Sequence, residues 1–505
     1  MSAPNGAPLT DRTIHAGLWT VGARLASRGV DFLTLLVLAR FLGPADFGLV
    51  ATAMTLIFIV EAVLELPLVS ALLRLQDITP RAFSTAFTLG LLRGLLVAGL
   101  MASLAWPIAR IYGDDRLVLL ICTLALAPAT RGLISPRMIL FEKAMDFRRR
   151  GLLELIGKAL AATVAISIAV TTGSYWAITA GTVMTPMVMM ICSYAMAPMR
   201  PRLTLADWPL FSEMIGWNFV SQTIAAVNWQ IDRILLPRFI DVASFGRFAA
   251  ANDLSQLPHQ AIAAPAAGPL MAAFVAARDN GRVREAYLSS SASLILVLMP
   301  VYVFMAMFSG PVIRVLLGPQ WVDASPILAG LATAGLLGLP SIPMPPLVMV
   351  MNQSRSLAVR SVIELMVRVP LSLIGVTFFG IAGAVVARAG GSIAVSVSSM
   401  ALVRSVAGVT FLDQLRVARR PVGAILPSML VLALCKTYFD FERDLYIAFL
   451  ASGFLFCLTY TIFVYVLWFL AKRPGGVEAS AFRIASKVLR RRRRQEGVDV
   501  STAND

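Results

Sequence analysis

Long apolar stretches separated by short polar connections dominate this chain. About fourteen of them reach the length of about twenty residues that a helix needs to cross about 30 Å of hydrocarbon. They run roughly over residues 17–39, 47–72, 83–108, 117–140, 152–171, 175–197 and 211–237 in the first half, and over 245–276, 288–308, 326–351, 356–379, 381–403, 422–436 and 445–470 in the second. The pattern predicts an all-α integral membrane protein with about fourteen transmembrane helices.

The composition indicates that most of this chain lies in a lipid bilayer. Hydrophobic residues make up 58% of the sequence and charged residues only 14%, with a mean hydropathy of +0.78. A soluble domain has about 45–50% apolar and about 25% charged residues. The difference excludes a cytoplasmic enzyme, a secreted disulfide scaffold and a disordered protein.

The net charge of +16 comes from 44 Lys and Arg against 28 Asp and Glu. The basic residues fall between apolar stretches rather than in a soluble module, so we expect no nucleic-acid partner. Anionic lipid head groups and an anionic cargo are the expected partners. The four cysteines lie in apolar stretches and show neither a disulfide nor a zinc spacing, so no metal or cofactor is expected: Cys122, Cys192, Cys435 and Cys457.

Lys and Arg are distributed unequally between alternate connections. One set contains most of them, including 148–150, 200–202 and 278–284, and the positive-inside rule assigns this set to the cytoplasm. Both termini are then cytoplasmic, which requires an even number of crossings. The segment after Leu470 is basic and includes Arg490–Arg494, and it is expected to lie on the anionic inner leaflet as an anchor or a regulatory site.

An internal repeat is visible in the sequence. The stretch 38–48 (LARFLGPADFG) is echoed by 236–246 (LPRFIDVASFG), with Leu, Arg, Phe, Ala, Phe and Gly in register. Six predicted crossings separate the two copies, so both enter the membrane in the same direction. The halves are expected to be parallel repeats about an axis along the membrane normal, with the substrate site between them.

The repeat predicts the following organisation: a cytoplasmic segment 1–16, six-helix lobes 17–204 and 205–410, a helix pair 411–470 and a basic cytoplasmic tail 471–505.

Two motifs carry a family resemblance. The turn from Arg40 to Gly48 and the stretch 316–328 (LLGPQWVDASPIL) resemble those of Wzx-type polysaccharide flippases in the multidrug/oligosaccharidyl-lipid/polysaccharide (MOP) exporter superfamily. The similarity is to the branch that serves succinoglycan- and colanic-acid-type export. It implies two pseudo-symmetric lobes in a V-shaped, MATE-like arrangement in the bacterial inner membrane.

The same resemblance implies a function. Such a protein moves undecaprenyl-diphosphate-linked oligosaccharide units to the periplasmic leaflet by alternating access. A polysaccharide polymerase and a co-polymerase are the expected protein partners.

Charged residues inside apolar stretches are the candidate site. A cationic side chain at a helix centre costs roughly 2.5–3.5 kcal/mol on insertion scales, so repeated cases indicate a hydrated cavity. Arg24, Arg28 and Asp31 share one face of the first helix, where the guanidinium groups suit phosphate. The alternative is a structural ion pair that closes the lobe interface.

The matching helix of the second lobe carries a polar stripe of Asn218, Gln222, Trp229 and Arg233, suited to sugar hydroxyls, ring faces and phosphate. Interhelical hydrogen bonding is the competing interpretation. Single arginines within apolar stretches are predicted to line the cavity, and burial in helix packing is the alternative: Arg93, Arg131 and Arg388.

Acidic residues and a histidine supply candidates for ion coupling: Asp31, Glu61, Glu65, Asp253 and His259. Glu61 and Glu65 have no basic partner in their own helix, so they are expected to meet arginines of the first helix or to take up protons. Histidine ordinarily titrates near neutrality, as a coupling site requires, although a lone histidine such as His259 is more often a packed polar residue. Glu154/Lys158 and Glu364/Arg368 are spaced four apart and are interpreted as intrahelical ion pairs.

Prolines interrupt two of the predicted crossings. Pro258, Pro265 and Pro269 lie in the eighth, and a group from Pro340 to Pro346 lies in the tenth. Each proline removes a backbone donor and disfavours a straight helix. The breaks are expected to be either moving parts or static kinks.

Three function classes follow from these observations. A lipid-linked oligosaccharide flippase fits the cationic helices. A MATE-like drug antiporter is the alternative, although a cationic cavity repels cationic drugs. A polysaccharide polymerase or ligase needs a large periplasmic loop, which the short connections do not supply. The stretch 151–159 fails the phosphate-loop pattern, so no ATP hydrolysis is expected.

Overall fold

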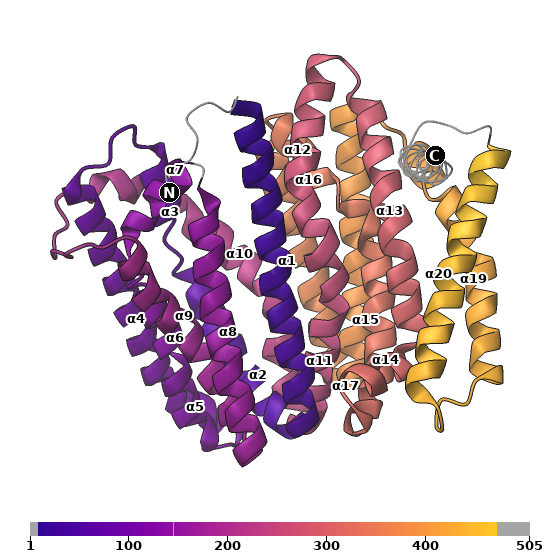
Figure 1. Cartoon of the computed structure of the whole chain (residues 1–505), viewed down its shortest axis with the longest axis horizontal. Coiled ribbons are helices and arrows are strands. Elements are labelled where there is room, and N and C mark those ends of the chain that lie inside the picture. The colour runs from indigo at the N-terminus through magenta and orange to yellow at the C-terminus, as the bar shows by residue number, and fades with distance from the viewer. Residues whose placement is uncertain (1–8, 145, 472–505) are drawn as a thin grey trace, which may run out of the picture. The chain divides into compact units, whose positions relative to one another are not determined.

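The computed structural model describes residues 9–144 and 146–471, and every regular element among them is helical (Figure 1). In the first half the elements are α1 (Leu9–Phe41), α2 (Pro44–Val63), α3 (Leu68–Arg74), α4 (Pro80–Tyr112), α5 (Arg116–Leu124), α6 (Leu126–Arg131), η1 (Pro136–Met138), α7 (Ile139–Lys143), α8 (Phe147–Thr172), α9 (Trp176–Met196) and α10 (Pro209–Phe239). In the second half they are α11 (Val242–Pro258), η2 (His259–Ala263), α12 (Ala264–Asp279), α13 (Val283–Met307), α14 (Ser309–Leu316), η3 (Pro319–Ala324), α15 (Ser325–Gly338), η4 (Leu339–Ser341), α16 (Met344–Val350), α17 (Ser354–Ala407), α18 (Phe411–Arg416), α19 (Arg419–Tyr438) and α20 (Leu445–Leu470).

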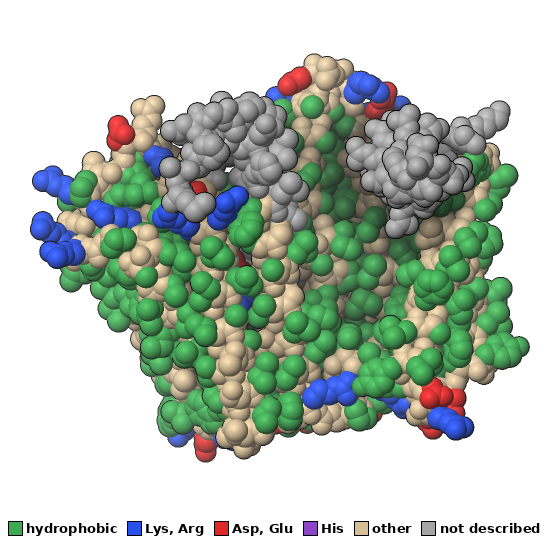
Figure 2. Space-filling view, viewed as in Figure 1, with side chains coloured by type: hydrophobic (Ala, Val, Ile, Leu, Met, Phe, Trp, Pro, Cys, Tyr) green, Lys and Arg blue, Asp and Glu red, His purple; other side chains and the backbone are tan. Residues whose placement is uncertain are grey.

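The helices are long and apolar enough for a multi-pass membrane protein. Among the described residues, 10 helical runs could cross a membrane, and an eleventh results if Arg116–Arg131 and Pro136–Lys143, bent by 51°, form one span. Figure 2 shows hydrophobic side chains over the middle of the helices, with most of the visible charged side chains near helix ends. The all-helical membrane class is confirmed, while fourteen crossings stay a prediction.

The described chain separates into two compact units. The first contains the residues up to Leu254 together with Leu316–Leu328 and Ser361–Gly391. The second contains Ser255–Val315, Ala329–Arg360 and the described residues from Ser392 onward.

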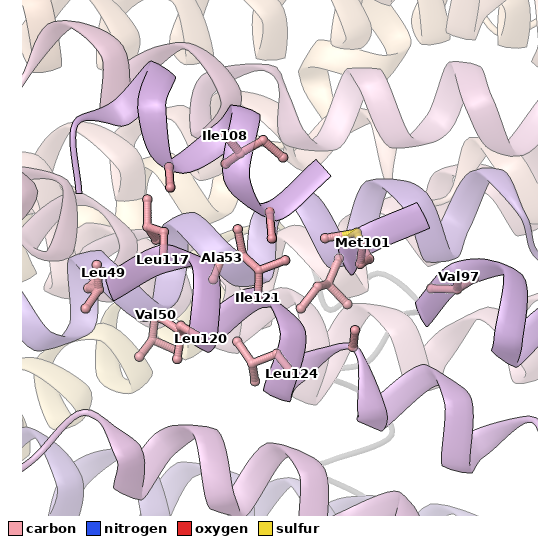
Figure 3. Close-up of a cluster of buried hydrophobic side chains, with 14 residues drawn as sticks. Leu49, Val50, Ala53, Val97, Met101, Ile108, Leu117, Leu120, Ile121 and Leu124 are labelled. Carbon is pink, nitrogen blue, oxygen red and sulfur yellow. The ribbon is translucent and has the colours of Figure 1, made fainter. Parts of the chain in front are cut away.

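The core of the first unit is built from α2, α4 and α5. Fully buried Ala53, Met101 and Leu120 belong to one cluster of apolar side chains from these three helices, drawn in Figure 3. Small residues let helices approach closely in lipid, where packing rather than the hydrophobic effect holds them together. Gly90 and Gly132 illustrate this, because a Cβ on Gly90 would lie 2.5 Å from the carbonyl oxygen of Gly132.

The second unit packs around aromatic side chains. Phe304 of α13 contacts Phe456 of α20, with ring centroids 5.5 Å apart, and Tyr460 donates a hydrogen bond to the Leu296 carbonyl over 2.9 Å. A further buried cluster joins Phe274 and Tyr287 to apolar residues of α16 and α17. The contacts of Phe304 and Tyr460 attach α20, the last of the described helices, to α13.

The breaks expected from proline are present, and a glycine adds another. Gly380 adopts φ 57° and ψ −130°, a conformation that favours glycine, and divides α17 at the point between the predicted stretches 356–379 and 381–403. Pro258 ends α11 and is followed by the π-helical turn η2. Pro340 lies in the 3₁₀ turn η4 and Pro343 precedes α16, so both proline-containing crossings are interrupted.

Both copies of the repeat form the same local structure, a helix of more than thirty residues followed by a tight turn and a second helix. In the first copy the Asp46 carboxylate accepts a hydrogen bond from the Gly43 backbone N–H over 3.2 Å. In the second the Asp241 carboxylate accepts one from the Ser244 backbone N–H over 2.8 Å. Hydrogen bonding by Ser244 also lowers the pKa of the Asp241 carboxyl below its ordinary value. An aspartate thus stabilises the start of the second helix in each copy.

Candidate functional site

A lysine between two carboxylates forms the first polar group, between α1 and α8. Lys158 Nζ lies 2.7 Å from Asp31 Oδ2 and 3.1 Å from Glu154 Oε1. Ser27 Oγ donates to Glu154 Oε1 over 2.7 Å. The predicted pairing of Glu154 with Lys158 is confirmed, and Lys158 additionally joins α8 to α1.

The two arginines of α1 remain largely uncompensated. Arg28 Nη1 lies 3.7 Å from Asp31 Oδ2, and its side chain is 56% exposed. Arg24, one turn earlier, is also exposed and has no ion-pair partner within the described part of the chain. Because Asp31 is closer to Lys158 than to Arg28, the guanidinium groups keep donors for another anion. Whether they face a cavity stays a prediction.

Glu61 is at the centre of a second group, formed by α2, α4 and α6. Arg131 Nη1 donates to Glu61 Oε1, and Arg93 Nη2 lies 3.9 Å from the same carboxylate oxygen. Arg93 also donates to the backbone carbonyls of Leu64 (2.7 Å) and Glu61 (2.9 Å). These bonds supply donors to carbonyl groups at the C-terminal end of α2. Glu65 lies close enough to Arg93 to interact electrostatically.

This second group corrects one expectation. Glu61 does not meet arginines of the first helix, because its partners come from α4 and α6. Helical spacing identified Glu61 as lacking a local partner, but it contains no information on which neighbouring helix supplies one. The proposed roles of Arg93 and Arg131 in lining a cavity stay predictions.

The most buried group surrounds Asp232 of α10, whose side chain is only 1% exposed. Arg368 Nη2 lies 2.9 Å from Asp232 Oδ2, and Ser372 Oγ donates to Oδ1 over 2.8 Å. Arg388 Nε lies 3.4 Å from Asp232 Oδ2, and its Nη2 donates to Asn252 Oδ1 over 2.8 Å. The carboxylate therefore receives two arginines, one from each half of the kinked helix α17.

Arg233, the next residue on α10, pairs with the half-exposed Asp253 of α11. Arg368 also lies 3.8 Å from Glu364, so the predicted Glu364–Arg368 pair is present but longer than the contact of 2.9 Å with Asp232. Three arginines face three carboxylates here: Arg233, Arg368 and Arg388 against Asp232, Asp253 and Glu364. The buried part of this set, Asp232 with Arg368 and Arg388, is expensive to desolvate, so its presence points to specificity or function more than to stability.

Some predicted residues fall outside these groups. The side chains of Asn218, Gln222 and Trp229 lie outside the described residues, so their predicted roles stay untested. On the same helix, buried Asn228 donates to the Ser361 carbonyl over 3.1 Å, which is interhelical hydrogen bonding. His259 lies half-buried in the π-helical turn η2 of the second unit. Residues 9–144 and 146–471 contain no group of three His, Cys, Asp or Glu side chains that could hold a metal ion.

The sequence did not identify the central position of Asp232 or the double role of Lys158. Both residues were visible in the sequence, but their strongest partners are on other helices. Spacing rules detect neighbours three or four residues apart and give no information about such contacts. An acid within an apolar stretch is a sequence signal that could have identified Asp232.

The two motifs that carry the family resemblance contact each other. Buried Trp321 donates from Nε1 to the Ala39 carbonyl over 2.9 Å, and Gln320 donates to the same oxygen over 2.7 Å. The Trp321 ring also meets Phe47 edge to face, with centroids 5.0 Å apart. Motif 316–328 thus packs on the turn that ends α1, which gives both motifs a structural role.

Comparison with known proteins agrees with this resemblance. The profile of a family described as "Polysaccharide biosynthesis protein" matches residues 37–326. The succinoglycan biosynthesis transport protein ExoT of Rhizobium meliloti (strain 1021) is 25% identical over 317 residues, which cover 62% of this chain and 64% of ExoT. The lipopolysaccharide biosynthesis protein WzxC of Escherichia coli (strain K12) is 19% identical over 338 residues, covering 65% and 68%. The match therefore spans less than two thirds of ExoT.

Solved structures show the fold. The lipid II flippase MurJ in an inward closed conformation superimposes with a TM-score of 0.71 over 91% of this chain and 100% of MurJ, at 16% sequence identity. An inward-facing multidrug resistance MATE transporter of the MOP superfamily gives a TM-score of 0.55 over 79% of this chain and 98% of its own, at 14% identity. The described helices therefore have the fold of MOP-superfamily transporters.

Proposed function

This chain belongs to the polysaccharide biosynthesis protein family and is a MOP-superfamily transporter rather than an enzyme, and we propose that it is a lipid-linked oligosaccharide flippase. Its cargo is an undecaprenyl-diphosphate-linked oligosaccharide unit, moved from the cytoplasmic to the periplasmic leaflet for exopolysaccharide or lipopolysaccharide synthesis. The location is the bacterial inner membrane, with a polysaccharide polymerase and a co-polymerase as partners.

One observation carries this proposal: two exposed arginines lie one turn apart on α1, and Lys158 already engages both carboxylates of the adjacent group, Asp31 and Glu154. A diphosphate presents several anionic oxygens, and guanidinium forks bind such oxygens through paired charge-assisted hydrogen bonds. In lipid such a pair of cations is costly unless it meets water or an anion. Arg24 and Arg28 are therefore assigned to the diphosphate.

The proposed topology has fourteen crossings. It adds to the ten apolar runs the bent pair α5–α7, the two charged helices α1 and α10, and a second crossing from α17, which is divided at Gly380. Two pseudo-symmetric six-helix lobes (17–204 and 205–410) and a helix pair (411–470) follow, with both termini cytoplasmic. Alternating access would then occur through a cationic cavity between V-shaped lobes.

The remaining candidate residues have assigned roles in this scheme. Arg93, Arg131, Arg233 and Arg388 line the cavity together with the polar stripe Asn218, Gln222 and Trp229. The candidates for coupling to an ion gradient are Asp31, Glu61, Glu65, Asp253 and His259. Asp253 combines exposure of half its side chain with a contact to Arg233, which suits a carboxylate that exchanges its partner during transport.

The proposal is tested in the bacterium that carries this gene. Deletion followed by mass spectrometry of extracted lipids is expected to show accumulated undecaprenyl-diphosphate oligosaccharides, and an unchanged lipid pool would contradict the cargo. The Arg24→Ala/Arg28→Ala double variant is expected to abolish export at unchanged protein abundance. The matched Arg24→Lys/Arg28→Lys variant keeps the charge and is expected to retain part of the export.

The MATE-like drug antiporter is the alternative, and the same strain distinguishes it. An antiporter would leave polymer export intact and lower resistance to cationic drugs on deletion. The flippase is expected to give the reverse pattern.

A further inference from the structure

A cavity of about 490 Å³ outside the ion-pair groups is lined by four arginines: Arg81, Arg137, Arg200 and Arg202. It lies in the first unit, between the first turns of α4, the turn η1 and the connection that leads from α9 to α10. Its other lining residues are apolar or hydroxylic, and none is acidic. The cavity therefore brings four positive charges together without a carboxylate among its lining residues.

The acid on the same connection is not among the residues that line the cavity. Asp207 follows the arginines of this connection, and its carboxylate accepts a long hydrogen bond of 3.5 Å from Thr79. No ion pair is found for Arg81, Arg137, Arg200 or Arg202 among residues 9–144 and 146–471. Four like charges in one cavity repel each other, so the site is expected to gain from a bound anion.

Hydrogen bonds hold the cavity wall in place. The Thr204 backbone N–H donates to Thr88 Oγ1 over 3.0 Å, and the Asp207 N–H donates to Thr85 Oγ1 over 3.4 Å, both on buried turns of α4. Arg137 donates to the Pro198 carbonyl over 2.9 Å and lies 5.9 Å above the Phe83 ring. The connection that carries Arg200 and Arg202 is thus fixed to α4.

The start of α4 adds to the positive potential. Pro80 and Arg81 occupy the first turn of this 33-residue helix, where Thr79 caps the Ala82 N–H over 3.1 Å. Backbone N–H groups and the helix dipole at such an end favour anions. The dipole and the guanidinium groups therefore act on the same cavity.

Large apolar side chains beside the cavity indicate where its ligand comes from. Leu203 lines the cavity and is 72% exposed, and Leu205, Trp208 and Leu210 along the same segment are exposed as well. Exposed leucines and a tryptophan next to arginines are typical of a segment at the membrane surface, where the rings and aliphatic chains lie among lipid chains. A free phosphate ion would use the arginines but not these side chains.

We propose that this cavity binds the phosphate head group of an anionic phospholipid, with the acyl chains against Leu203, Leu205 and Trp208. The arginines bind the phosphate oxygens, and the exposed apolar segment keeps the lipid in the leaflet. On the topology predicted from loop charges this face is cytoplasmic, where anionic lipids supply negative surface potential. The site is separate from Arg24 and Arg28 and does not depend on the nature of the cargo.

The test is native mass spectrometry of the purified full chain titrated with dioleoyl-phosphatidylglycerol or dioleoyl-phosphatidylcholine. We expect tighter binding of the phosphatidylglycerol, and about a tenfold or greater loss of that binding in Arg200→Ala/Arg202→Ala, because charge-assisted hydrogen bonds to phosphate are lost. The control is Arg416→Ala/Arg419→Ala, which removes the same charge from two exposed arginines outside the cavity and is expected to bind as the unmodified protein does.

Two further arms identify the source of the anion. Leu203→Ser/Trp208→Ser keeps all four arginines and is expected to weaken lipid binding, which a purely ionic site would not show. Millimolar inorganic phosphate is expected not to displace the lipid, and full displacement would overturn the assignment to phospholipid. Equal loss in the cavity variant and in its charge-matched control would overturn the site itself.

Discussion

Gly48 of α2 and Gly246 of α11 pack backbone against backbone, and they occupy equivalent positions in the two copies of the repeat. A Cβ on Gly48 would lie 1.8 Å from the Val242 carbonyl oxygen, and a Cβ on Gly246 would lie 1.8 Å from the Pro44 carbonyl oxygen. Val242 precedes Gly246 by four residues, as Pro44 precedes Gly48, so the contact is reciprocal. The contact has local two-fold symmetry, as expected for two copies of a repeat, and neither glycine has room for a side chain larger than hydrogen.

We expect Gly48→Ala and Gly246→Ala each to lose most polymer export, because the added methyl group must separate α2 from α11. Overpacking of a fixed contact typically costs about 1–3 kcal/mol, so a lower thermal unfolding midpoint should accompany the loss. Export assays and thermal unfolding in detergent measure the two effects.

Gly43→Ala is the control from the same turn. Its φ of −80° suits any residue, and a Cβ there meets nothing closer than 3.8 Å. Export and unfolding temperature are expected to stay near those of the unmodified protein. If Gly43→Ala and Gly48→Ala were equally harmful, the close approach could not be the cause.

Asp232→Ala should strongly destabilise the protein. Removing one partner of a buried ion pair costs about 3–5 kcal/mol, and here two arginines, Arg368 and Arg388, would lose their shared carboxylate. The control is Asp279→Ala, which removes an acid that is 61% exposed and pairs with the exposed Arg278, and it is expected to cost about 1 kcal/mol or less. Thermal unfolding of the two purified variants compares them, and equal shifts would contradict the burial argument.

Trp321→Ala is expected to destabilise the first unit by about 3–5 kcal/mol, the usual cost of deleting a fully buried aromatic side chain. It also removes one of the two hydrogen bonds to the Ala39 carbonyl. Trp106→Ala is the control, since that indole is exposed and lies against the guanidinium group of Arg110. Equal losses of stability in the two variants would show that the contact between the motifs stabilises the protein no more than an exposed tryptophan does.

The topology can be tested with single cysteines placed in a variant without the four natural ones. A cysteine at Asn280 is expected to react with a membrane-impermeant maleimide only after the inner membrane is permeabilised. One at Asp115 should react in cells whose outer membrane alone is permeable. The opposite labelling pattern would reverse the predicted orientation of both termini.

The sequence by itself determined the helical membrane class and several local features. The length of the apolar stretches predicted the helices, because every backbone N–H and C=O group inside lipid needs a hydrogen-bond partner and a helix supplies these partners itself. The prolines predicted breaks because each changes the backbone at its own position. Glu154 and Lys158 were predicted as a pair because four residues make about one helical turn.

Only the tertiary structure decided which helices bring their charged side chains into contact. Asp232 meets arginines from both halves of α17, Glu61 meets Arg93 and Arg131, and Lys158 reaches across to Asp31. Helical periodicity identifies the face on which a side chain lies, but not the helix that packs there. That choice depends on the summed packing of distant segments, which the periodicity of a single helix does not encode.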